Sequence, residues 1–192
     1  MLKEFDIMID LETLSTRPNS VILTLAAVRF DRYATPNKID MIDTNFNVNN
    51  DNIFYRKITI DSCLDIGLVK DQKTVDWWNQ QTESIRNEAF SPIDRIPIKQ
   101  ALEELTTFFG NDKKQCVWSH GSCFDCVILD EAFNRCGMQT PWKYFNVRDT
   151  RTLFELSSIT HNQLPIASHH AVFDCLRQIY GVNLAISKIY KL

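Results

Sequence analysis

Four carboxylates and one histidine occur in this chain in an order that could build a site for divalent cations. Asp10 and Glu12 stand two residues apart in IMIDLETLS, and Asp125 lies in WSHGSCFDCVIL. His169 and Asp174 lie in HHAVFD. Magnesium and manganese bind oxygen ligands of this kind, and a two-metal cluster with a base for the attacking water hydrolyses phosphodiesters. Because the groups are far apart in the sequence, only a fold can bring them together.

The first acidic pair lies on a predicted strand. Apolar and polar residues alternate from Phe5 to Glu12, which is the period of a β-strand. Asp10 and Glu12 therefore project from the same face. Two adjacent carboxylates raise each other's pKa unless a cation lies between them. Taken alone, the pair is better explained as two solvated acids on an exposed strand face.

Asp125 follows Phe124 at the start of a predicted helix. The helix dipole favours an acid at that position even where no metal binds. By itself, Asp125 is therefore adequately explained by its place in the helix.

His169 and Asp174 lie at the start of the last predicted helix, where Ser168 is the expected N-cap. Five helical residues span a rotation of about 140°, so the two side chains would not share a face if both were helical. We therefore expect His169 on the loop before the helix, where it can act as a general base toward a water. The alternative is a capping or surface histidine, and no role is expected for His170.

In order, the motifs DxE, FD and HxAxxD resemble the DEDDh 3'-5' exonucleases of the ribonuclease H-like superfamily. They are Asp10-Leu11-Glu12, Phe124-Asp125 and the segment from His169 to Asp174. Their joint occurrence is far more specific than any one of them. The strings WWNQQ, WSHGSCFD and VRDTRTL are similar to the branch that holds ribonuclease AS and phage exodeoxyribonuclease A.

The resemblance implies a role for each matched residue. Asp10, Glu12, Asp125 and Asp174 would bind two divalent cations, Mg²⁺ or Mn²⁺, and His169 would accept the proton of the attacking water. The substrate would be the 3' end of single-stranded or 3'-overhanging RNA or DNA, and the product a nucleoside 5'-monophosphate. The implied fold is α/β, a ribonuclease H-like mixed five-stranded sheet with its first three strands antiparallel and helices on its flanks.

Three residues near the motifs are candidates for the terminal nucleotide. Thr13, next to Glu12, would present its backbone to that nucleotide. Trp77 or Trp78 would stack on a base, an interaction worth roughly 1–3 kcal/mol per base. The competing explanation is that one tryptophan is a core residue and the other covers it.

Of three further candidates, Phe124 and Asp149 have evenly matched alternatives. Phe124 would wedge against a base or belong to the core. His120 would line the cleft. Asp149 would be a polar group of the site, or it would form a salt bridge with Arg148 or Arg151.

Strands followed by helices are predicted to position these residues, starting with an antiparallel meander. The predicted strands are Phe5–Glu12, Val21–Phe30, Thr44–Val48 and Gln115–Trp118. The predicted helices are Lys73–Thr82, Ile98–Phe109, Asp125–Cys136, Val147–Ser157 and Ser168–Tyr180, the last ended by Gly181.

The composition of the 192 residues, 44% hydrophobic and 23% charged, predicts a single domain, residues 1–192. No apolar run is long enough to span a bilayer, and acids within the N-terminal apolar stretch exclude a signal peptide. We therefore expect a cytoplasmic protein whose six cysteines are free thiols. Cys123 and Cys126 are expected to be small buried side chains at a helix start rather than zinc ligands.

The net charge of −3 argues against tight coating of duplex nucleic acid, but recognition of a strand end needs few phosphate contacts. Two alternatives stay open: a non-catalytic nucleic-acid or nucleotide binding module of the same fold, and a proofreading subunit of a polymerase. The choice between RNA and DNA depends on a contact to the 2'-hydroxyl, which the sequence does not place. Assembly is also open, with a homodimer as one candidate because oligoribonucleases form dimers.

Overall fold

A single mixed β-sheet forms the frame of the molecule. The computed structural model describes residues 5–36, 51–112, 114–166 and 168–190. Within these residues the sheet has six strands in the order β4-β3-β2-β1-β5-β6. Their bounds are β1 (Asp6–Thr13), β2 (Ile22–Phe30), β3 (Ile53–Ile58), β4 (Arg95–Ile96), β5 (Val117–Ser119) and β6 (Val147–Asp149).

The strand directions confirm the predicted fold class. β2 is antiparallel to both of its neighbours, β1 and β3. β5 pairs parallel with β1, and β6 pairs parallel with β5. The first three strands are therefore antiparallel, as expected. The two-residue β4, parallel to β3 at the edge, makes one strand more than the five expected.

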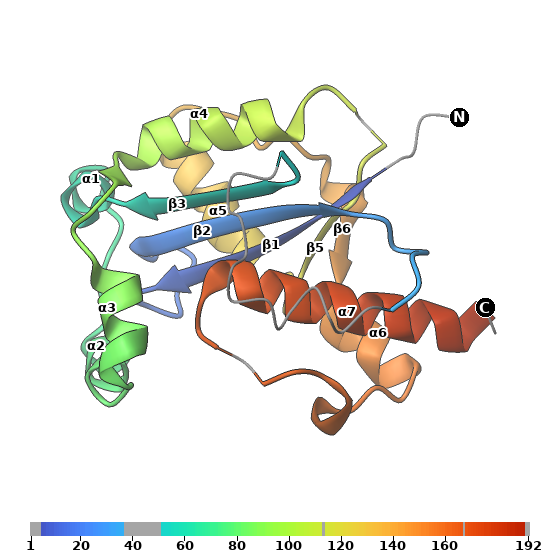
Figure 1. The fold of residues 1–192 in the computed structure, drawn as a ribbon. Helices are drawn as coiled ribbons and strands as arrows, with labels where there is room; N and C mark the ends of the chain where they lie inside the picture. Colours follow the sequence, from blue (N-terminus) through green and yellow to red (C-terminus); the bar gives the residue numbers. More distant parts are fainter. Residues whose placement is uncertain (1–4, 37–50, 113, 167, 191–192) are drawn as a thin grey trace.

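Helices cover both faces of the sheet (Figure 1). α7 (Ala171–Tyr190) crosses one face against β1 and β2, with α6 (Thr150–Leu156) beside it. α4 (Ile98–Phe109) and α5 (Asp125–Arg135) pack together on the opposite face. The short helices α1 (Ile60–Asp65), α2 (Gln72–Asn79) and α3 (Glu83–Phe90) gather near the edge at which β1 ends. Single 3-10 turns occupy Tyr144–Asn146 and His161–Gln163.

β1 separates two apolar cores. Ile7 and Ile9 belong to the core beneath α4 and α5, whereas Met8 belongs to the core beneath α7. All three side chains are completely buried. Both faces of β1 are therefore covered, so the explanation of its acids as solvated groups on an exposed face is wrong.

α7 does not end at Gly181, as the sequence had suggested, but continues to Tyr190. A Cβ atom at position 181 would collide with the ring of Phe154 on α6. Glycine costs a helix interior roughly 0.5–1 kcal/mol relative to alanine. Here it permits the close approach of α6 and α7, and close packing rather than termination explains the residue.

The segment predicted as one helix from Val147 to Ser157 begins as a strand, β6. The helix α6 starts only at Thr150 because Asp149 is its N-cap: the carboxylate accepts a hydrogen bond of 3.0 Å from the backbone amide of Thr152.

The first turn of α7 is capped by His170 instead of Ser168. Nδ1 of His170 accepts a hydrogen bond of 3.2 Å from the backbone amide of Val172, and its carbonyl accepts one of 2.9 Å from the amide of Asp174. The histidine for which no role was expected therefore fixes the start of the helix.

The predicted strand Thr44–Val48 lies outside the described residues, and the third strand of the sheet is β3. The other predicted helices and strands are confirmed to within a few residues at each end. None of the helices in the described part of the chain meets the length and hydrophobicity that a membrane span requires.

Candidate active site

The predicted acidic residues meet at the edge where the central strands end. β1 and β5 run parallel, so their carboxyl ends point the same way, which is where α/β sheets commonly form ligand sites. Asp10 and Glu12 both project from β1 toward the α7 side, and Glu12 is only 9% exposed. The register between β1 and β2 shifts between Glu12 and Thr13, at the end of the strand.

Asp125, the first residue of α5, is fastened to β1. Its Oδ1 accepts a hydrogen bond of 3.2 Å from the backbone amide of Leu11, and the side chain is buried. A helix-dipole acid would need no such burial. The contact brings the start of α5 against the strand between Asp10 and Glu12.

α7 brings the remaining carboxylate and the histidine to the same place. One ligand atom each of Glu12, His169 and Asp174 lie within 4.8 Å of one another. His169 stands on the loop before α7, as expected, with a backbone φ of 52°. Oδ1 of Asp174 accepts a hydrogen bond of 3.1 Å from the amide of Ser168, which ties this loop to the helix.

The carboxylates raise one another's pKa. Burial raises the pKa of Asp10 well above its usual range, and the charges of Asp125, Glu12 and Asp174 raise it further. Burial, followed by the charges of Asp174 and Asp125, raises the pKa of Glu12 to about 8. Burial raises the pKa of Asp125 to about 7. No lysine or arginine of the described residues forms an ion pair with this cluster. The charge of Arg151 lowers the pKa of Asp125 but does not offset the effect of burial.

Gln178, which the sequence reasoning missed, supports the cluster from α7. Its Nε2 donates a hydrogen bond of 2.7 Å to Oδ1 of Asp10, and its Oε1 is buried without a hydrogen-bond partner. Gln178 follows Asp174 by four residues, so both lie on one face of the helix. That spacing is the signal by which the sequence could have revealed it.

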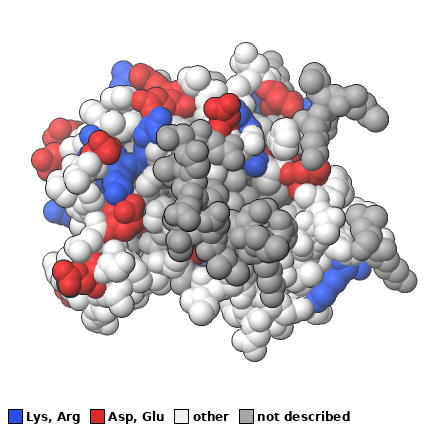
Figure 2. Space-filling model, viewed as in Figure 1, with Lys and Arg blue, Asp and Glu red and all other residues white. Residues whose placement is uncertain are grey.

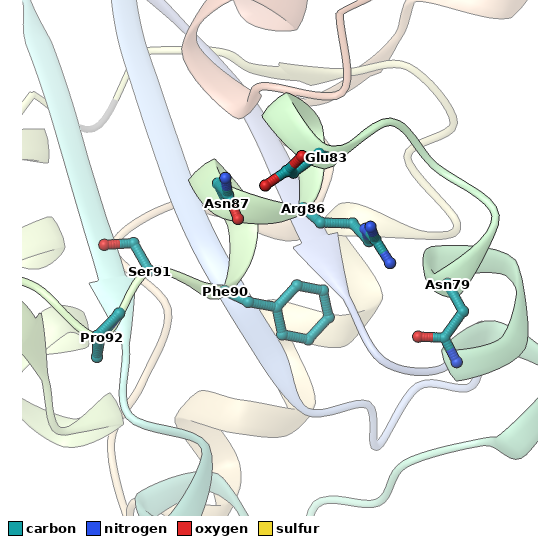
Figure 3. Close-up of a pocket in the computed structure, with 7 residues that line it drawn as sticks. All are labelled: Asn79, Glu83, Arg86, Asn87, Phe90, Ser91 and Pro92. Atoms are coloured by element: carbon teal, nitrogen blue, oxygen red, sulfur yellow. The ribbon is translucent and has the colours of Figure 1, made fainter.

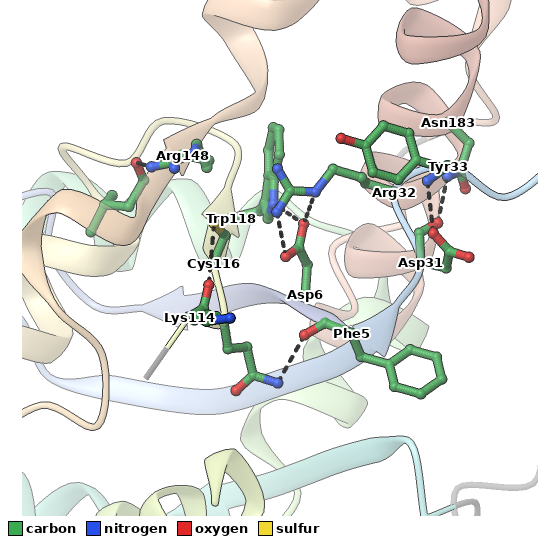
Figure 4. Close-up of polar contacts among 12 residues, drawn as sticks. Phe5, Asp6, Asp31, Arg32, Tyr33, Lys114, Cys116, Trp118, Arg148 and Asn183 are labelled. Atoms are coloured by element: carbon green, nitrogen blue, oxygen red, sulfur yellow. Dashed lines mark hydrogen bonds and ion pairs between the residues drawn. The ribbon is translucent and has the colours of Figure 1, made fainter. Parts of the chain in front are cut away.

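A third acid on the α7-facing side of β1 has quite different surroundings (Figure 4). Asp6 accepts hydrogen bonds of 2.7 Å from Nη2 of Arg32 and 2.8 Å from Nε1 of Trp118. Burial alone lowers the pKa of Arg32, but the hydrogen bond and charge of Asp6 outweigh it, and the pKa is raised. The negative charge of Asp6 is therefore balanced by the positive charge of Arg32.

A cavity of about 500 Å³ opens beside Glu12. Its walls combine apolar surfaces with hydroxyl groups and one lysine. The lining residues are Leu11, Glu12, Thr13, Thr16, Asp71, Lys73, Thr74, Trp77, Trp78 and Phe124. The volume lies within the range typical of small-molecule sites.

The two adjacent tryptophans have different environments. Trp78 is 1% exposed, and its Nε1 donates a hydrogen bond of 2.9 Å to the carbonyl of Thr13. Trp77 is 39% exposed and meets the ring of His169 edge-on, with the ring centroids 5.1 Å apart. One tryptophan is therefore a core residue, and the other lies between the cavity and the histidine.

Two other candidates do not line this cavity. Nδ1 of His120 lies 2.8 Å from the hydroxyl of Thr150. Burial and the charge of Arg151 lower the pKa of His120 to about 4. The carboxylate of Asp149 caps α6 and also accepts a hydrogen bond from the amide of Ser122, a role that differs from both a polar group of the site and the alternative salt bridge. Both contacts connect the loop between β5 and α5 to the start of α6.

A second hollow, of about 600 Å³, lies between the end of α2 and α3 (Figure 3). Its lining residues are Asn79, Glu83, Arg86, Asn87, Phe90, Ser91 and Pro92. The ring of Phe90 lies 5.4 Å from that of Trp78, which also lines the first cavity. With a single carboxylate, the second hollow lacks the acidic cluster that distinguishes the first site.

Comparison with known sequences identifies a family and one relative. The family model described as the 3'-5' exoribonuclease Rv2179c-like domain matches residues 5–185. The exodeoxyribonuclease of Enterobacteria phage T4 is 23% identical over 217 residues, which cover 95% of this chain and 89% of the phage protein.

Comparison with solved structures shows the same fold. Exonuclease I of E. coli in complex with a dT13 oligonucleotide has a TM-score of 0.60 at 16% identity. The match covers 98% of this chain and 42% of that one, so the chain spans about two fifths of exonuclease I. The RNase domain of the yeast Pop2 protein has a TM-score of 0.54 at 10% identity, covering 96% of this chain and 77% of that domain.

The expected resemblance to 3'-5' exonucleases is confirmed by the family match, which takes in all five residues of the acidic and histidine motifs. The chain belongs to the Rv2179c-like family of 3'-5' exoribonuclease domains, and it is accordingly a hydrolytic 3'-5' exonuclease.

Proposed function

We propose that the protein is a two-metal 3'-5' exonuclease that removes nucleoside 5'-monophosphates from single-stranded or 3'-overhanging nucleic acid, with His169 as the general base. The observation that carries the proposal is a group of buried and half-buried carboxylates that form no ion pair with a lysine or arginine of the described residues. Ionisation of all these carboxyl groups becomes energetically favourable only when cations bind beside them.

The donor set fits magnesium or manganese. Asp10, Glu12, Asp125 and Asp174 supply only carboxylate oxygens, the ligand type that these hard cations prefer. The raised pKa values of Asp10 and Glu12 support the same reading, because a bound cation would stabilise their ionised forms. When bound, two such ions lower the pKa of a water and neutralise charge on the phosphate.

His169 takes the proton of the attacking water in this proposal. One ring nitrogen lies within 4.8 Å of a carboxylate oxygen of Glu12 and of Asp174, which supports a role for the ring beside the proposed cation site. The edge-on contact with Trp77 restricts where the ring can turn. The water oxygen bonds to phosphorus, the bond to the 3'-oxygen of the preceding nucleotide breaks, and that oxygen gains a proton.

The cavity beside Glu12 would hold the terminal nucleoside. Trp77 and Phe124 offer aromatic surfaces to a base, and Leu11 adds an aliphatic wall. The carbonyl of Thr13 is occupied by Trp78, which fixes this part of the wall. We assign Trp77, and not the buried Trp78, to the substrate.

Charge on the surface supports recognition of a strand end rather than a long duplex. On the face seen in Figure 2, acidic and basic side chains are interspersed. With a net charge of −3, the chain lacks the general positive field that would hold a duplex along its length. Lys73 on the cavity wall and the bound cations would provide local positive charge for a few phosphates.

RNA and DNA both remain substrates in this proposal. The family description names an exoribonuclease and the phage relative is an exodeoxyribonuclease, while the exonuclease I structure contains single-stranded DNA.

All six cysteines are free, which is compatible with action in the reducing cytoplasm. Homodimer formation stays a separate proposal, for gel filtration to decide.

Cleavage of oligonucleotides labelled at either end, with magnesium and with EDTA, tests the proposal. We expect release of labelled mononucleotide from the 3' end, and a loss of roughly 10²- to 10⁴-fold in His169→Ala. Asp125→Asn should be inactive, whereas Asp130→Asn, an exposed acid on the same helix, should be normal.

Two outcomes would replace the proposal. Oligonucleotide binding in EDTA without any turnover in magnesium would favour a non-catalytic binding module. Release of label from the 5' end first would reverse the proposed polarity. Parallel RNA and DNA substrates of one sequence would reveal the sugar preference.

A further inference from the structure

His170, next to the proposed base, is held by its side chain as well as by its backbone. Its Nδ1 accepts the amide hydrogen of Val172, so this nitrogen carries no hydrogen and the neutral ring carries its hydrogen on Nε2. The carbonyl of the same residue accepts the amide of Asp174. The ring orientation and tautomer are both fixed by the first turn of α7.

Contacts from two other elements hold the same ring. It stacks on Tyr55 of β3, with centroids 5.1 Å apart and planes 23° apart, and it contacts Phe173 at 4.7 Å. Its Nε2 lies 3.6 Å from Oε1 of Glu88 on α3. That oxygen also accepts a hydrogen bond of 2.7 Å from the hydroxyl of Tyr55 and pairs with Nζ of Lys57 at 3.1 Å. We call Tyr55, Lys57, Glu88 and His170 the Glu88 cluster.

The backbone of His169 needs such support. Its φ of 52° lies in the left-handed region, which residues other than glycine adopt rarely and at a cost in free energy. On one side the ring of Trp77 contacts its imidazole, and on the other side the backbone continues directly into His170. The contacts of His170 therefore restrain the peptide that carries the imidazole.

We propose that the Glu88 cluster positions His169 for catalysis, with Glu88 as a positioning residue that acts through His170. Glu88 does not line the nucleotide cavity and belongs to no group of ligand atoms around the carboxylates. Its three contacts join α3, β3 and the start of α7 at one carboxylate oxygen. This inference rests on the proposed role of His169 as the base.

A double-mutant cycle tests it on the full-length chain. We expect Glu88→Gln to lower kcat on a 3'-labelled oligonucleotide by roughly 10- to 100-fold, the effect of a small misplacement of a catalytic group. KM and the magnesium dependence should stay unchanged. In a His169→Ala background the same substitution should cost no further activity, because its effect passes through the missing imidazole.

Glu104 on α4 provides a matched control, because its partner lies on β3 next to Tyr55 and Lys57. Glu104 pairs with Arg56, the residue between Tyr55 and Lys57, and its side chain is 33% exposed against 36% for Glu88. Glu104→Gln removes a comparable ion pair from the neighbouring position and should leave kcat unchanged. Tyr55→Phe keeps the ring and loses the hydroxyl, so it should show a smaller loss of kcat of the same kind.

The outcomes separate this inference from the proposed function. Wild-type kcat in Glu88→Gln, or an equal loss in both backgrounds, would refute the positioning role while leaving the base assignment intact. Wild-type activity in His169→Ala alone would instead refute the base. Thermal unfolding of each variant, expected to be close to wild type, excludes loss of folded protein as the cause.

Discussion

The two ends of the α7-facing side of β1 carry the same kind of residue in opposite circumstances. At one end, Asp6 accepts hydrogen bonds from Arg32 and Trp118, and its charge is balanced. At the other end, Asp10 and Glu12 face further carboxylates, and the donor found for Asp10 is the neutral amide of Gln178. One strand thus contains an acid that the fold satisfies and a pair that it leaves unsatisfied.

The difference shows how a structural acid can be told from a ligand. A buried ion pair loses much of its favourable energy to desolvation unless hydrogen bonds complete it, as they do at Asp6. Clustered carboxylates without a cation destabilise their own ionised forms. The chain can tolerate the second arrangement where an external cation supplies the missing charge.

Matched amide substitutions at the two ends should separate activity from stability. We expect Asp10→Asn to lower the cleavage rate by on the order of 10³-fold, because it removes a ligand of the cations that stabilise the reacting phosphate. The metal-free variant should be at least as stable as wild type, because asparagine is neutral at every pH and so has no ionised form to be buried beside the other carboxylates. Cleavage rates measure the effect on activity, and urea unfolding in EDTA measures the effect on stability. A loss of stability without a loss of activity would mean that Asp10 is a structural acid like Asp6.

The unbalanced end should also make the metal-free protein sensitive to pH. The pKa of Glu12 rises from an ordinary 4.5 to about 8 on folding. Between these values the folded chain keeps a proton that the unfolded chain releases, so the free energy of unfolding falls as pH rises. We expect a fall of roughly 3–4 kcal/mol from about pH 5 to pH 8 in EDTA.

Magnesium should oppose that fall, most strongly at the higher pH, because it binds the ionised carboxylates. Glu12→Gln should flatten the dependence. Urea titrations at each pH provide the measurement, and a free energy that increases over this range would contradict the assigned direction of the shift.

A substitution at Gln178 tests the end of β1 that carries Asp10 and Glu12 without changing any of the proposed cation ligands. Gln178→Met keeps the approximate volume and removes the hydrogen bond to Asp10. We expect magnesium affinity to fall roughly 10- to 100-fold, as when a group that orients a metal ligand is lost. Activity should recover at saturating metal. A loss of kcat that metal does not restore would assign Gln178 a different role.

The smallest effect is expected at the balanced end. Asp6→Asn removes the charge that pairs with Arg32 and turns one acceptor into a donor beside existing donors. We expect a loss of about 1–3 kcal/mol in the free energy of unfolding. Cleavage per folded molecule should not change, and neither should the affinity for magnesium. Reduced metal affinity in this variant would show that the two ends are coupled.

Much of the fold was predictable because its signals are local. Alternation from Phe5 to Glu12 identified β1, observed as Asp6–Thr13, and the helical spacing of apolar residues identified α4 and α5. Gly181 misled because a glycine at a close contact between helices resembles a glycine that ends a helix. Only the position of Phe154 distinguishes the two, and that residue is far away in the sequence.

The site divides in the same way. The motifs predicted that Asp10, Glu12, Asp125, Asp174 and His169 belong together, and the structure places them around one edge of the sheet. It also gives Trp77 and Trp78 different exposures, and it leaves His120 outside the cavity beside Glu12. Those assignments depend on packing between elements that are distant in the sequence. The local sequence around each residue carries no signal of that packing.

By itself, the sequence determined which residues are the candidates for the chemistry and on which face of β1 two of them stand, because strand periodicity and motif order are properties of the chain. Only the tertiary structure decided which acids are neutralised. Arg32 lies beside Asp6, while no lysine or arginine among the described residues pairs with the carboxylates around Glu12. Charge balance depends on which side chains folding brings within a few ångströms, and that distance is not encoded in sequence separation.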